Sequence, residues 1–279
     1  MKINFRIFLA LSLLMIINMD ALSQNSLKVM SFNIRQCMVN DGPNNWKLRK
    51  EATPAMLEDI MPDILGVQEA YLTQVKYIKQ ECPVYRSVGR GRNDGRRCGE
   101  HTAIFFNKSK FKLLDNGMFW LSQTPDVPSI GWDAKYSRTA TWAKLRCISS
   151  GEEFIVINTH LDNVGLAART NGLKMICDWV DNYNSDGLPV VLLGDFNIRP
   201  EDSSLEYLNT QMLCAREHAG ISDQSGSYTG YGNRNEVCII DYIYYRGFSA
   251  CHEFKVNNKE YAGKKYISDH YPIYAIFEF

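Results

Sequence analysis

Short apolar runs recur along the chain and predict strands. The first run, 27–34, carries apolar residues at odd and even positions alike, as a strand covered on both faces requires. Later runs have the same character. We therefore expect strands at 27–34, 64–67, 102–106, 139–145, 154–158, 190–193, 239–245 and 271–279.

Helical periodicity appears between these runs. It is clearest over 166–183, where one predicted face carries Leu166, Leu173, Ile176, Cys177 and Val180. Two further helices are predicted at 49–60 and 72–80, the first with Pro54 in its first turns or kinking it.

The order of elements favours an α/β sandwich over a doubly wound parallel sheet. Strands and helices alternate irregularly, and hairpin-like strand pairs occur beside crossovers. The pattern lapses over 115–138, which we interpret as a long ordered loop because it carries aromatic residues that need burial or a ligand. Because no repeat or charge block divides the chain, we expect one domain over 24–279.

The first residues are typical of a secretory signal. A basic start precedes a short apolar run over 7–17, and small residues two apart follow at Ala21 and Ser23. We predict a signal peptide at 1–23, export to the periplasm or the outside, and no stable membrane insertion after its removal. An uncleaved anchor is the alternative.

Composition adds two constraints. Thirty-one basic residues balance thirty-one acidic ones, so no overall positive field attracts long polyanions such as duplex DNA. Eight cysteines are compatible with disulfides in an oxidising compartment, and their pairing stays open. The sequence has no C-x-x-C pair, which disfavours a zinc site or a redox motif. Cys147 and Cys177 fall in apolar patterns that favour buried free thiols.

Polar residues stand at the ends of several predicted strands. Each group alone is explained by a turn, a helix cap or a structural histidine. Their joint position at strand ends instead predicts one site at a sheet edge. The groups are Asn33, Gln68-Glu69, His160 with Asp162 and Asn163, Asp195 with Asn197, and Asp269-His270.

This ordered set resembles the signature of the endonuclease/exonuclease/phosphatase superfamily, whose fold is shared by DNase I-like nucleases and inositol-phosphate phosphatases. The resemblance spans nearly the whole mature chain, and its intervening motifs are most similar to a bacterial branch related to the deadenylase-like exonucleases. It implies two packed mixed β-sheets flanked by helices, a four-layer α/β sandwich with the site at one end. The motifs are Ser31-Phe32-Asn33, Gln68-Glu69, Gly99-Glu100, Asn158-Thr159-His160, Gly194-Asp195-Phe196-Asn197, Ile240-Asp241-Tyr242-Ile243 and Ser268-Asp269-His270.

A divalent metal is predicted on chemical grounds as well. Oxygen atoms of Glu69 and Asp269, with Asn33 nearby, would form a hard site suited to Mg²⁺ or Mn²⁺ and unsuited to zinc. By the resemblance, Glu69 is the firmest ligand.

The resemblance also implies the catalytic roles. Asp195 would orient or deprotonate the attacking water, with Asn197 positioning both water and phosphate. His160 would pair with Glu100 and His270 with Asp241, and each carboxylate would fix the imidazole's tautomer and favour its cation.

Several polar side chains are candidates for substrate binding. Asn33 and the arginines Arg35, Arg90, Arg97 and Arg138 can bind phosphate, although arginines are mostly solvated. Asn163 stands where relatives often carry histidine, and an amide donates to phosphate without shuttling protons. Stacking of a base or sugar on Trp132 or Tyr136 competes with a core role for each.

These observations predict a metal-dependent phosphoester hydrolase, expected to be a monomer. Within that class, a phosphodiesterase acting like an exonuclease, with nucleic acid only as substrate, stands beside a phosphatase of phospholipid, inositol-phosphate or sugar-phosphate headgroups. The alternative from another class is a non-catalytic binding protein on the same fold, which the retained charged residues disfavour.

Overall fold

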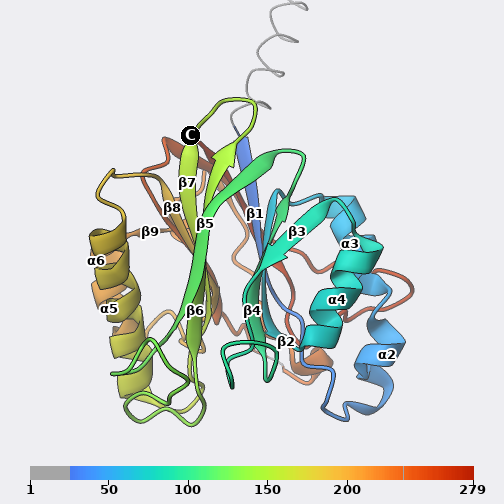
Figure 1. Cartoon of the computed structure of the whole chain (residues 1–279). Coiled ribbons are helices and arrows are strands. Elements are labelled where there is room, and N and C mark those ends of the chain that lie inside the picture. The colour runs from blue at the N-terminus through green and yellow to red at the C-terminus, as the bar shows by residue number, and fades with distance from the viewer. Residues whose placement is uncertain (1–25, 235) are drawn as a thin grey trace, which may run out of the picture.

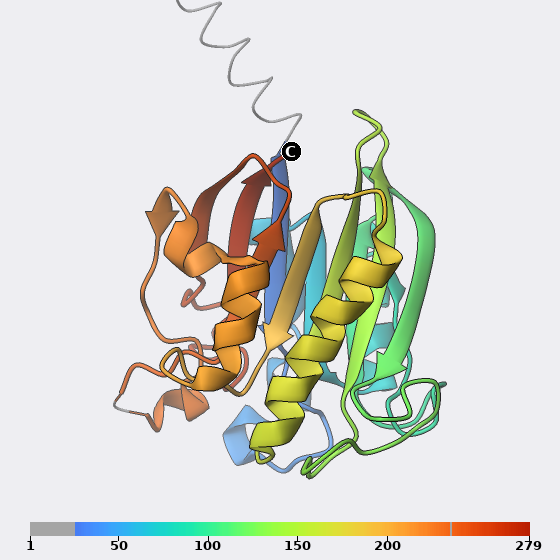
Figure 2. The same cartoon turned by 90° about the vertical axis from the view of Figure 1, so that its left-hand side faces the viewer.

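The chain forms four layers, with two β-sheets packed face to face between two layers of helices (Figures 1 and 2). The computed structural model describes residues 26–234 and 236–279, so the predicted signal peptide at 1–23 lies outside the described residues. The predicted sandwich of two mixed sheets flanked by helices is confirmed.

The first sheet has seven strands in the order β10-β12-β13-β1-β2-β4-β3. Strands β1 and β2 run parallel, as do β10 and β12, and the other neighbours are antiparallel. The strands are β1 (Ser26–Asn33), β2 (Ile64–Ala70), β3 (Tyr85–Val88), β4 (His101–Asn107), β10 (Ile221–Ser222), β12 (Ala250–Val256) and β13 (Ile273–Glu278).

The second sheet has six strands in the order β5-β6-β7-β8-β11-β9. Only β7 and β8 are parallel neighbours. The strands are β5 (Phe111–Trp120), β6 (Thr139–Cys147), β7 (Glu153–His160), β8 (Val190–Asp195), β9 (Leu213–Cys214) and β11 (Asp241–Arg246).

Helices cover the outer faces of both sheets. In Figure 1, α3 and α4 lie over the first sheet and α5 and α6 over the second. The α-helices are α2 (Trp46–Arg49), α3 (Ala52–Ile60), α4 (Leu72–Glu81), α5 (Leu166–Tyr183), α6 (Glu206–Gln211) and α7 (Ala215–His218), and the 3₁₀ turns are η1 (Gly42–Asn44), η2 (Ser203–Leu205) and η3 (Gly230–Gly232).

Three apolar layers hold the sandwich together. One lies between the sheets and includes Val29, Leu193 and Phe277. The second packs α5 and α6 on the second sheet, and the third packs α3 and α4 on the first. Strands of the inner sheets are thus buried on both faces, which explains their continuous apolar runs.

Some local predictions need correction. Residues 115–120, predicted as loop, belong to β5, whose apolar pattern is broken by a bulge between Leu113 and Asp115. Leu166 was predicted on the buried face of α5 but is 51% exposed. It is the first residue of the helix, and the buried residues of α5 begin only at Ala168. The helix predicted at 49–60 is α3, which begins three residues later at Ala52 with Pro54 in its first turn, whereas Arg49 is the last residue of the separate helix α2. Strands β3, β9, β10 and β12 were not predicted.

One polar contact ties the two sheets together beneath the site. The buried amide of Asn158 on β7 donates to the carbonyls of Val67 and Ala103 in the first sheet, both at 2.9 Å, and accepts from Gln68 at 2.8 Å. Gly66 makes room for this contact, since a Cβ there would lie 3.0 Å from Asn158 Cγ as well as 2.1 Å from a Leu193 methyl group. The ends of β2, β7 and β8 are thereby held together.

All eight cysteines lie in the described part of the chain and are free, with Cys147 and Cys177 buried as predicted. Over residues 26–234 and 236–279, the helices are too short or too polar to cross a bilayer.

Candidate active site

Strand register brings the motif residues to one edge of the two sheets. Asn33 ends β1, and Glu69 lies near the end of β2. In the second sheet, Asp195 at the end of β8 is paired with His160 of parallel β7 on one side and with Asp241 of antiparallel β11 on the other. A glycine precedes Asp195 because a Cβ at Gly194 would lie 2.0 Å from the Thr159 carbonyl oxygen.

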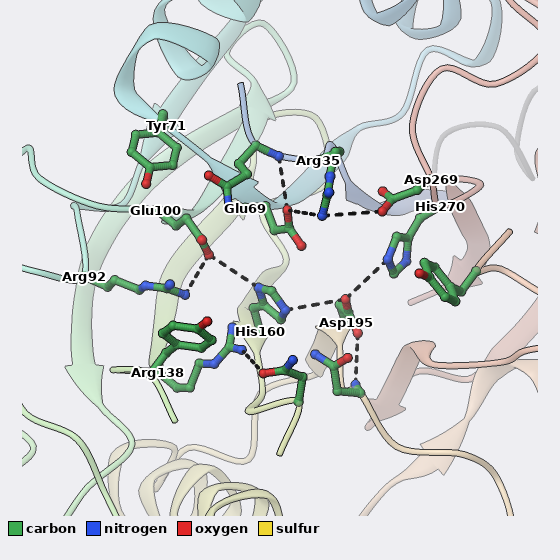
Figure 3. Close-up of a pocket in the computed structure, with 15 residues that line it drawn as sticks. Arg35, Glu69, Tyr71, Arg92, Glu100, Arg138, His160, Asp195, Asp269 and His270 are labelled. Carbon is green, nitrogen blue, oxygen red and sulfur yellow. Dashed lines mark hydrogen bonds and ion pairs between the residues drawn. The ribbon is translucent and has the colours of Figure 1, made fainter. Parts of the chain in front are cut away.

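These side chains surround a polar pocket of about 380 Å³ (Figure 3). The lining contains most of the predicted site residues and several that were not predicted. It consists of Arg35, Gln36, Glu69, Tyr71, Arg92, Glu100, Tyr136, Arg138, His160, Asn163, Asp195, Asn197, Tyr228, Asp269 and His270.

Asp195 lies at the centre of the site. One carboxylate oxygen accepts from the Asn33 amide at 2.9 Å and lies 3.6 Å from His160 Nε2 and 3.7 Å from His270 Nε2. The other oxygen accepts from the backbone N–H of Asn197 at 2.9 Å. Asp195 is thus fixed between two imidazoles.

Two predicted residues lie behind the pocket wall. Asn33 is fully buried, and its amide also donates to Glu69 at 3.2 Å, so it holds the Asp195 and Glu69 carboxylates in place. Asp241 is 2.8 Å from His270 Nδ1 and fixes that ring from behind.

The central groups have displaced titrations. Burial, reinforced by Asp241, raises the pKa of Asp195 to about 7. Burial opposes charge on His270, but Asp241 and Asp195 raise its pKa well above the usual value. His270 is therefore a cation at neutral pH, as predicted from its carboxylate partner.

His160 differs from this prediction. Burial lowers its pKa well below the usual value, and the charges of Arg138 and Arg92 add to the effect. Glu100, predicted to pair with it, lies 3.8 Å from His160 Nδ1 but 2.6 Å from Arg92 Nη1. Because burial and the neighbouring guanidinium groups disfavour charge on its ring, His160 is the neutral member of the two histidines.

Glu69 and Asp269 offer oxygen donors suited to a divalent cation. The Arg35 guanidinium lies between them, 4.0 Å from a Glu69 oxygen and 3.7 Å from an Asp269 oxygen (Figure 3). Burial raises the pKa of Asp269, and the Glu69 charge adds to this rise. Two carboxylates that need a positive charge between them fit Mg²⁺ or Mn²⁺, which favour carboxylate oxygen.

The backbone at the site is strained. Arg35, Glu69 and Asn197 have φ of 55°, 60° and 52°, a left-handed conformation that is rare outside glycine. Such conformations cost about 1–3 kcal/mol each and cluster at functional sites. The fold maintains these three residues against that cost.

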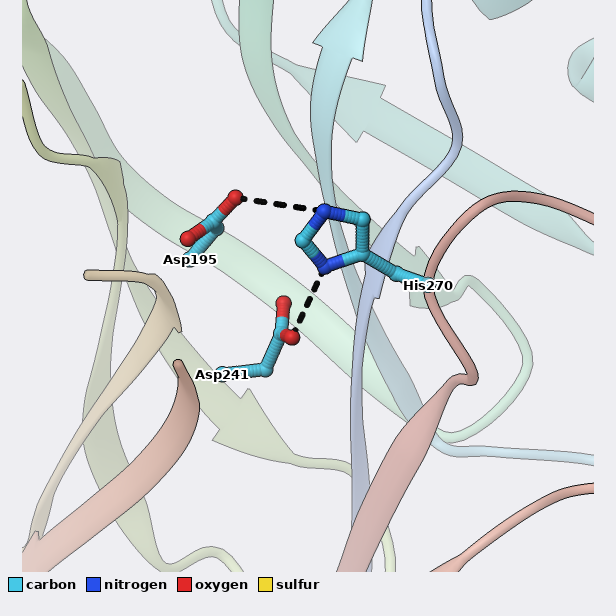
Figure 4. Close-up of side chains that lie close together, drawn as sticks. All are labelled: Asp195, Asp241 and His270. Atoms are coloured by element: carbon cyan, nitrogen blue, oxygen red, sulfur yellow. Dashed lines mark hydrogen bonds and ion pairs between the residues drawn. The ribbon is translucent and has the colours of Figure 1, made fainter. Parts of the chain in front are cut away.

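A second group of potential metal ligands is buried at the centre. One ligand atom from each of Asp195, Asp241 and His270 lies within 4.8 Å of the others (Figure 4). A metal bound to Nδ1 of His270 would replace the 2.8 Å contact of this nitrogen with Asp241, and a metal bound to Nε2 would stand between this nitrogen and Asp195. The oxygen pair of Glu69 and Asp269, which lines the pocket, fits a hard cation better.

Of the four arginines that were predicted to bind phosphate, two line the pocket and two do not. Arg35 and Arg138 line the pocket, whereas Arg90 and Arg97 are exposed and lie outside its lining. Arg97 points elsewhere because the Asp94 carboxylate accepts from the N–H groups of Arg96 to Cys98 and closes that loop into a tight turn. Arg92 enters the pocket instead, without a distinguishing signal in the sequence.

Two of the remaining candidates, Asn163 and Tyr136, line the pocket next to Arg138. Trp132 is not part of the pocket lining. Asp162, beside Asn163, supports this wall: burial opposes its charge, but the N–H groups of Gly165, Lys135 and Val164 lower its pKa to about 2.

Comparisons with known proteins agree with this geometry. Residues 30–270 match the model of the endonuclease/exonuclease/phosphatase family. A member of that family from Bacteroides thetaiotaomicron is 31% identical, with 91% of this chain and 98% of that chain covered and a TM-score of 0.86. The mannosyl-6-phosphatase of the same organism is 30% identical, with coverages of 91% and 100% and a TM-score of 0.86. Protein angel of Drosophila melanogaster is 29% identical over 220 residues, which are 71% of this chain and 58% of that protein.

Proposed function

The chain belongs to the endonuclease/exonuclease/phosphatase family, whose members hydrolyse phosphoesters, and we propose that it is itself a divalent-metal-dependent phosphoester hydrolase. The observation that carries the proposal is the position of Asp195, held by Asn33 and Asn197 between a neutral and a cationic histidine. Such an arrangement can direct a water molecule and stabilise phosphoryl oxygens in one step.

In the proposed reaction, water attacks phosphorus as the bond to the leaving-group oxygen breaks. The ionised Asp195 accepts the proton of the attacking water, and the leaving oxygen takes up a proton from solvent. Cationic His270 donates through Nε2 to a phosphoryl oxygen, while Asp241 holds its Nδ1. Asn197 lines the pocket beside Asp195 and orients the water or the phosphate. Each residue supplies a fixed charge or dipole where negative charge develops.

The metal would be held by Glu69 and Asp269, with Asn33 orienting Glu69. When bound, Mg²⁺ or Mn²⁺ supplies Lewis-acid polarisation of the phosphoryl group and neutralises its charge. Arg35 is hydrogen-bonded to Asp41 at 2.9 and 3.0 Å, so it would keep this partner if a cation took the place of its Nη1 between Glu69 and Asp269.

Two substrate classes follow from the family. A phosphodiester, including the end of a nucleic acid strand, is one. A phosphate ester of a small polar molecule is the other, and it is favoured by the pocket's volume of about 380 Å³ and by similarity to a mannosyl-6-phosphatase. Zero net charge also favours small substrates over long polyanions. Export to the periplasm or the outside and a monomeric state remain part of the proposal, argued from the sequence alone.

Metal removal tests the proposal. The purified chain should hydrolyse bis(p-nitrophenyl) phosphate or p-nitrophenyl phosphate in Mg²⁺ or Mn²⁺, lose this activity in excess EDTA and regain it when the metal is restored. An unchanged circular dichroism spectrum in EDTA is the control for unfolding. Turnover that survives chelation contradicts the metal assignment, and binding without cleavage in the presence of metal indicates a binding protein.

Replacement of Asp195 tests the assigned centre. The Asp195→Ala variant should lose about 10²- to 10⁴-fold in kcat, the usual contribution of a positioned general base. The matched control is Asp186→Ala, an exposed aspartate in the turn between α5 and β8. An unchanged kcat for Asp195→Ala removes this carboxylate from the mechanism.

A further inference from the structure

A groove runs between the open edges of the two sheets, outside the active-site pocket. β3 and β5 are the last strands of their sheets, and each has a strand neighbour on one side only in the described part of the chain. A cavity of about 420 Å³ lies between residues 86–90 of the β3 edge and residues 113–118 of β5, and a second cavity of about 460 Å³ continues it to α5. The two cavities share Arg90, Gly117 and Met118, and we call them together the edge groove. In Figure 1, β5 and β3 lie at the front of the molecule.

The first cavity of the edge groove is positively charged. Arg86 and Arg90 are the only charged residues in its lining, and both are exposed. Within residues 26–234 and 236–279, neither guanidinium forms an ion pair or a side-chain hydrogen bond, whereas Arg92 two residues further along is paired with Glu100. Surface arginines are commonly solvated, but two that line one concave surface without a carboxylate form a site for an anionic ligand.

The second cavity is apolar and aromatic. Its lining includes Phe119, Trp142, Met175 and Trp179, and the Trp142 and Trp179 ring centroids are 4.9 Å apart. Gly117 leaves room for the Trp142 indole on the edge strand, because a Cβ there would lie 2.7 Å from that ring. Aromatic rings beside a flexible methionine suit an apolar or aromatic side chain of a ligand.

The backbone along the edge groove favours an extended peptide. β5 is ten residues long, and such edge strands present unpaired N–H and C=O groups that natural proteins usually cover. A peptide in the extended conformation can pair with an edge of this kind through main-chain hydrogen bonds. Arg86 and Arg90 are four residues apart, or roughly 13 Å along an extended chain, so side chains at positions i and i+4 of such a peptide match their spacing.

We propose that the edge groove binds an extended acidic segment of a partner protein, with two carboxylates spaced for Arg86 and Arg90 and an aromatic residue beside the second. Arg90 lies where the two cavities meet, so the aromatic side chain next to its carboxylate partner enters the cavity at Trp179. A nucleic acid strand also carries anions, but it has no backbone amides for a sheet edge, and Asp126 and Asp178 in the second cavity repel its phosphates. The edge groove shares no lining residue with the active-site pocket, and the proposal does not depend on the hydrolase function.

The test measures binding of synthetic peptides to the whole chain by fluorescence anisotropy. The fluorescein-labelled probes are ETVTETFT and its reverse, TFTETVTE, which offer the same side chains in both strand directions. In the better of the two, replacing both glutamates by lysine, the threonine between them by proline, or the phenylalanine by serine should each weaken binding at least tenfold. These changes remove the charge pairing, the strand pairing and the buried aromatic ring, respectively. An eight-nucleotide oligothymidylate should also bind at least tenfold more weakly.

Variants of the two arginines locate the binding site. The double variant Arg86→Glu with Arg90→Glu should weaken peptide binding at least tenfold and favour the lysine peptide, because like charges then face the glutamates. Arg96→Glu with Arg97→Glu is the matched control, since it changes the net charge equally at exposed residues outside the edge groove, and it should alter binding less than threefold. Hydrogen exchange of the wild type should slow at 85–90 and 112–118 when the peptide is added.

Several results overturn the proposal. The first is no binding of either glutamate peptide at about 1 mM, the weak end of specific affinities. Others are equal binding of the lysine or proline peptide, wild-type affinity in the Arg86 and Arg90 double variant, and tighter binding of the oligothymidylate. A dimer in sedimentation equilibrium that dissociates in the same double variant would instead make a second copy of the chain the occupant. None of these results involves phosphate release, so they leave the hydrolase proposal untouched.

Discussion

Replacing Asn158 by alanine should destabilise the fold without removing a catalytic group. Although the residue belongs to the Asn158-Thr159-His160 motif, its side chain is fully buried and lies outside the pocket lining. It forms three hydrogen bonds of 2.8–2.9 Å between the two sheets. Asn158→Ala removes all three and leaves their partners buried.

The size of this effect follows from the bonds lost. At about 1 kcal/mol for each hydrogen bond, the three contribute about 3 kcal/mol, and the small cavity left behind adds about 1 kcal/mol. A change of 1 kcal/mol shifts Tm by about 2–4 °C in a domain of this size, so a loss of about 4 kcal/mol should lower Tm by about 8–16 °C.

Differential scanning calorimetry in EDTA measures the shift, and kcat/KM is compared well below the variant's Tm. Asn182→Ala is the control, because Asn182 is exposed on α5 and only donates to the Asp178 carbonyl. A Tm within 2 °C of wild type would refute the structural role. Loss of more than a hundredfold in kcat at unchanged Tm would instead place Asn158 in the chemistry.

Other predictions concern charge and capping. Since Asp195 must be ionised to accept a proton and its pKa is about 7, kcat/KM should rise with pH up to about 7 and then level, as a pH–rate profile would show; a flat profile from pH 5 to 8 contradicts this role. A carboxyl pKa raised by folding adds stability below the unfolded pKa near 4, and that stability is lost as pH rises through about 7. In EDTA, Asp195→Asn should therefore raise Tm relative to wild type more at pH 8 than at pH 5, and an equal difference at both values rejects this linkage. Asp133 accepts from Ala167 and Ala168 N–H groups at the start of α5, so Asp133→Ala should remove this cap and lower Tm, whereas Asp126→Ala in the same loop should leave Tm unchanged.

The convergence of the site was predictable because it depends on strand ends. Asn33, Glu69, His160 and Asp195 each follow a buried apolar run, and parallel neighbours bring such ends to one edge. Asp241 joins them from the start of an antiparallel strand, paired directly with Asp195. These placements need only the strand pattern and the known register rules of sheets.

The groups that line the pocket around Arg138 were harder to predict. Whether Arg92 or Arg97 enters the pocket depends on a turn closed by Asp94, since both arginines occur in the same polar segment. The neutral state of His160 depends on its complete burial and on the nearby charges of Arg138 and Arg92, and no pattern of residue types encodes that burial or those distances. β5 was missed in part because its bulge breaks the apolar alternation.

Hydrogen bonds fix the irregular segment 121–138 to the start of α5 and to Asp162. Asp133 caps α5, while Lys135 and Tyr136 donate to Asp162, the residue that also receives the N–H groups at 164 and 165. These hydrogen bonds hold this wall of the pocket in one conformation. Ligands are therefore selected by how well they fit that fixed shape, without a loop closing over them. New specificities on this scaffold would then have to arise by exchanging side chains along that wall, while its backbone path stays the same.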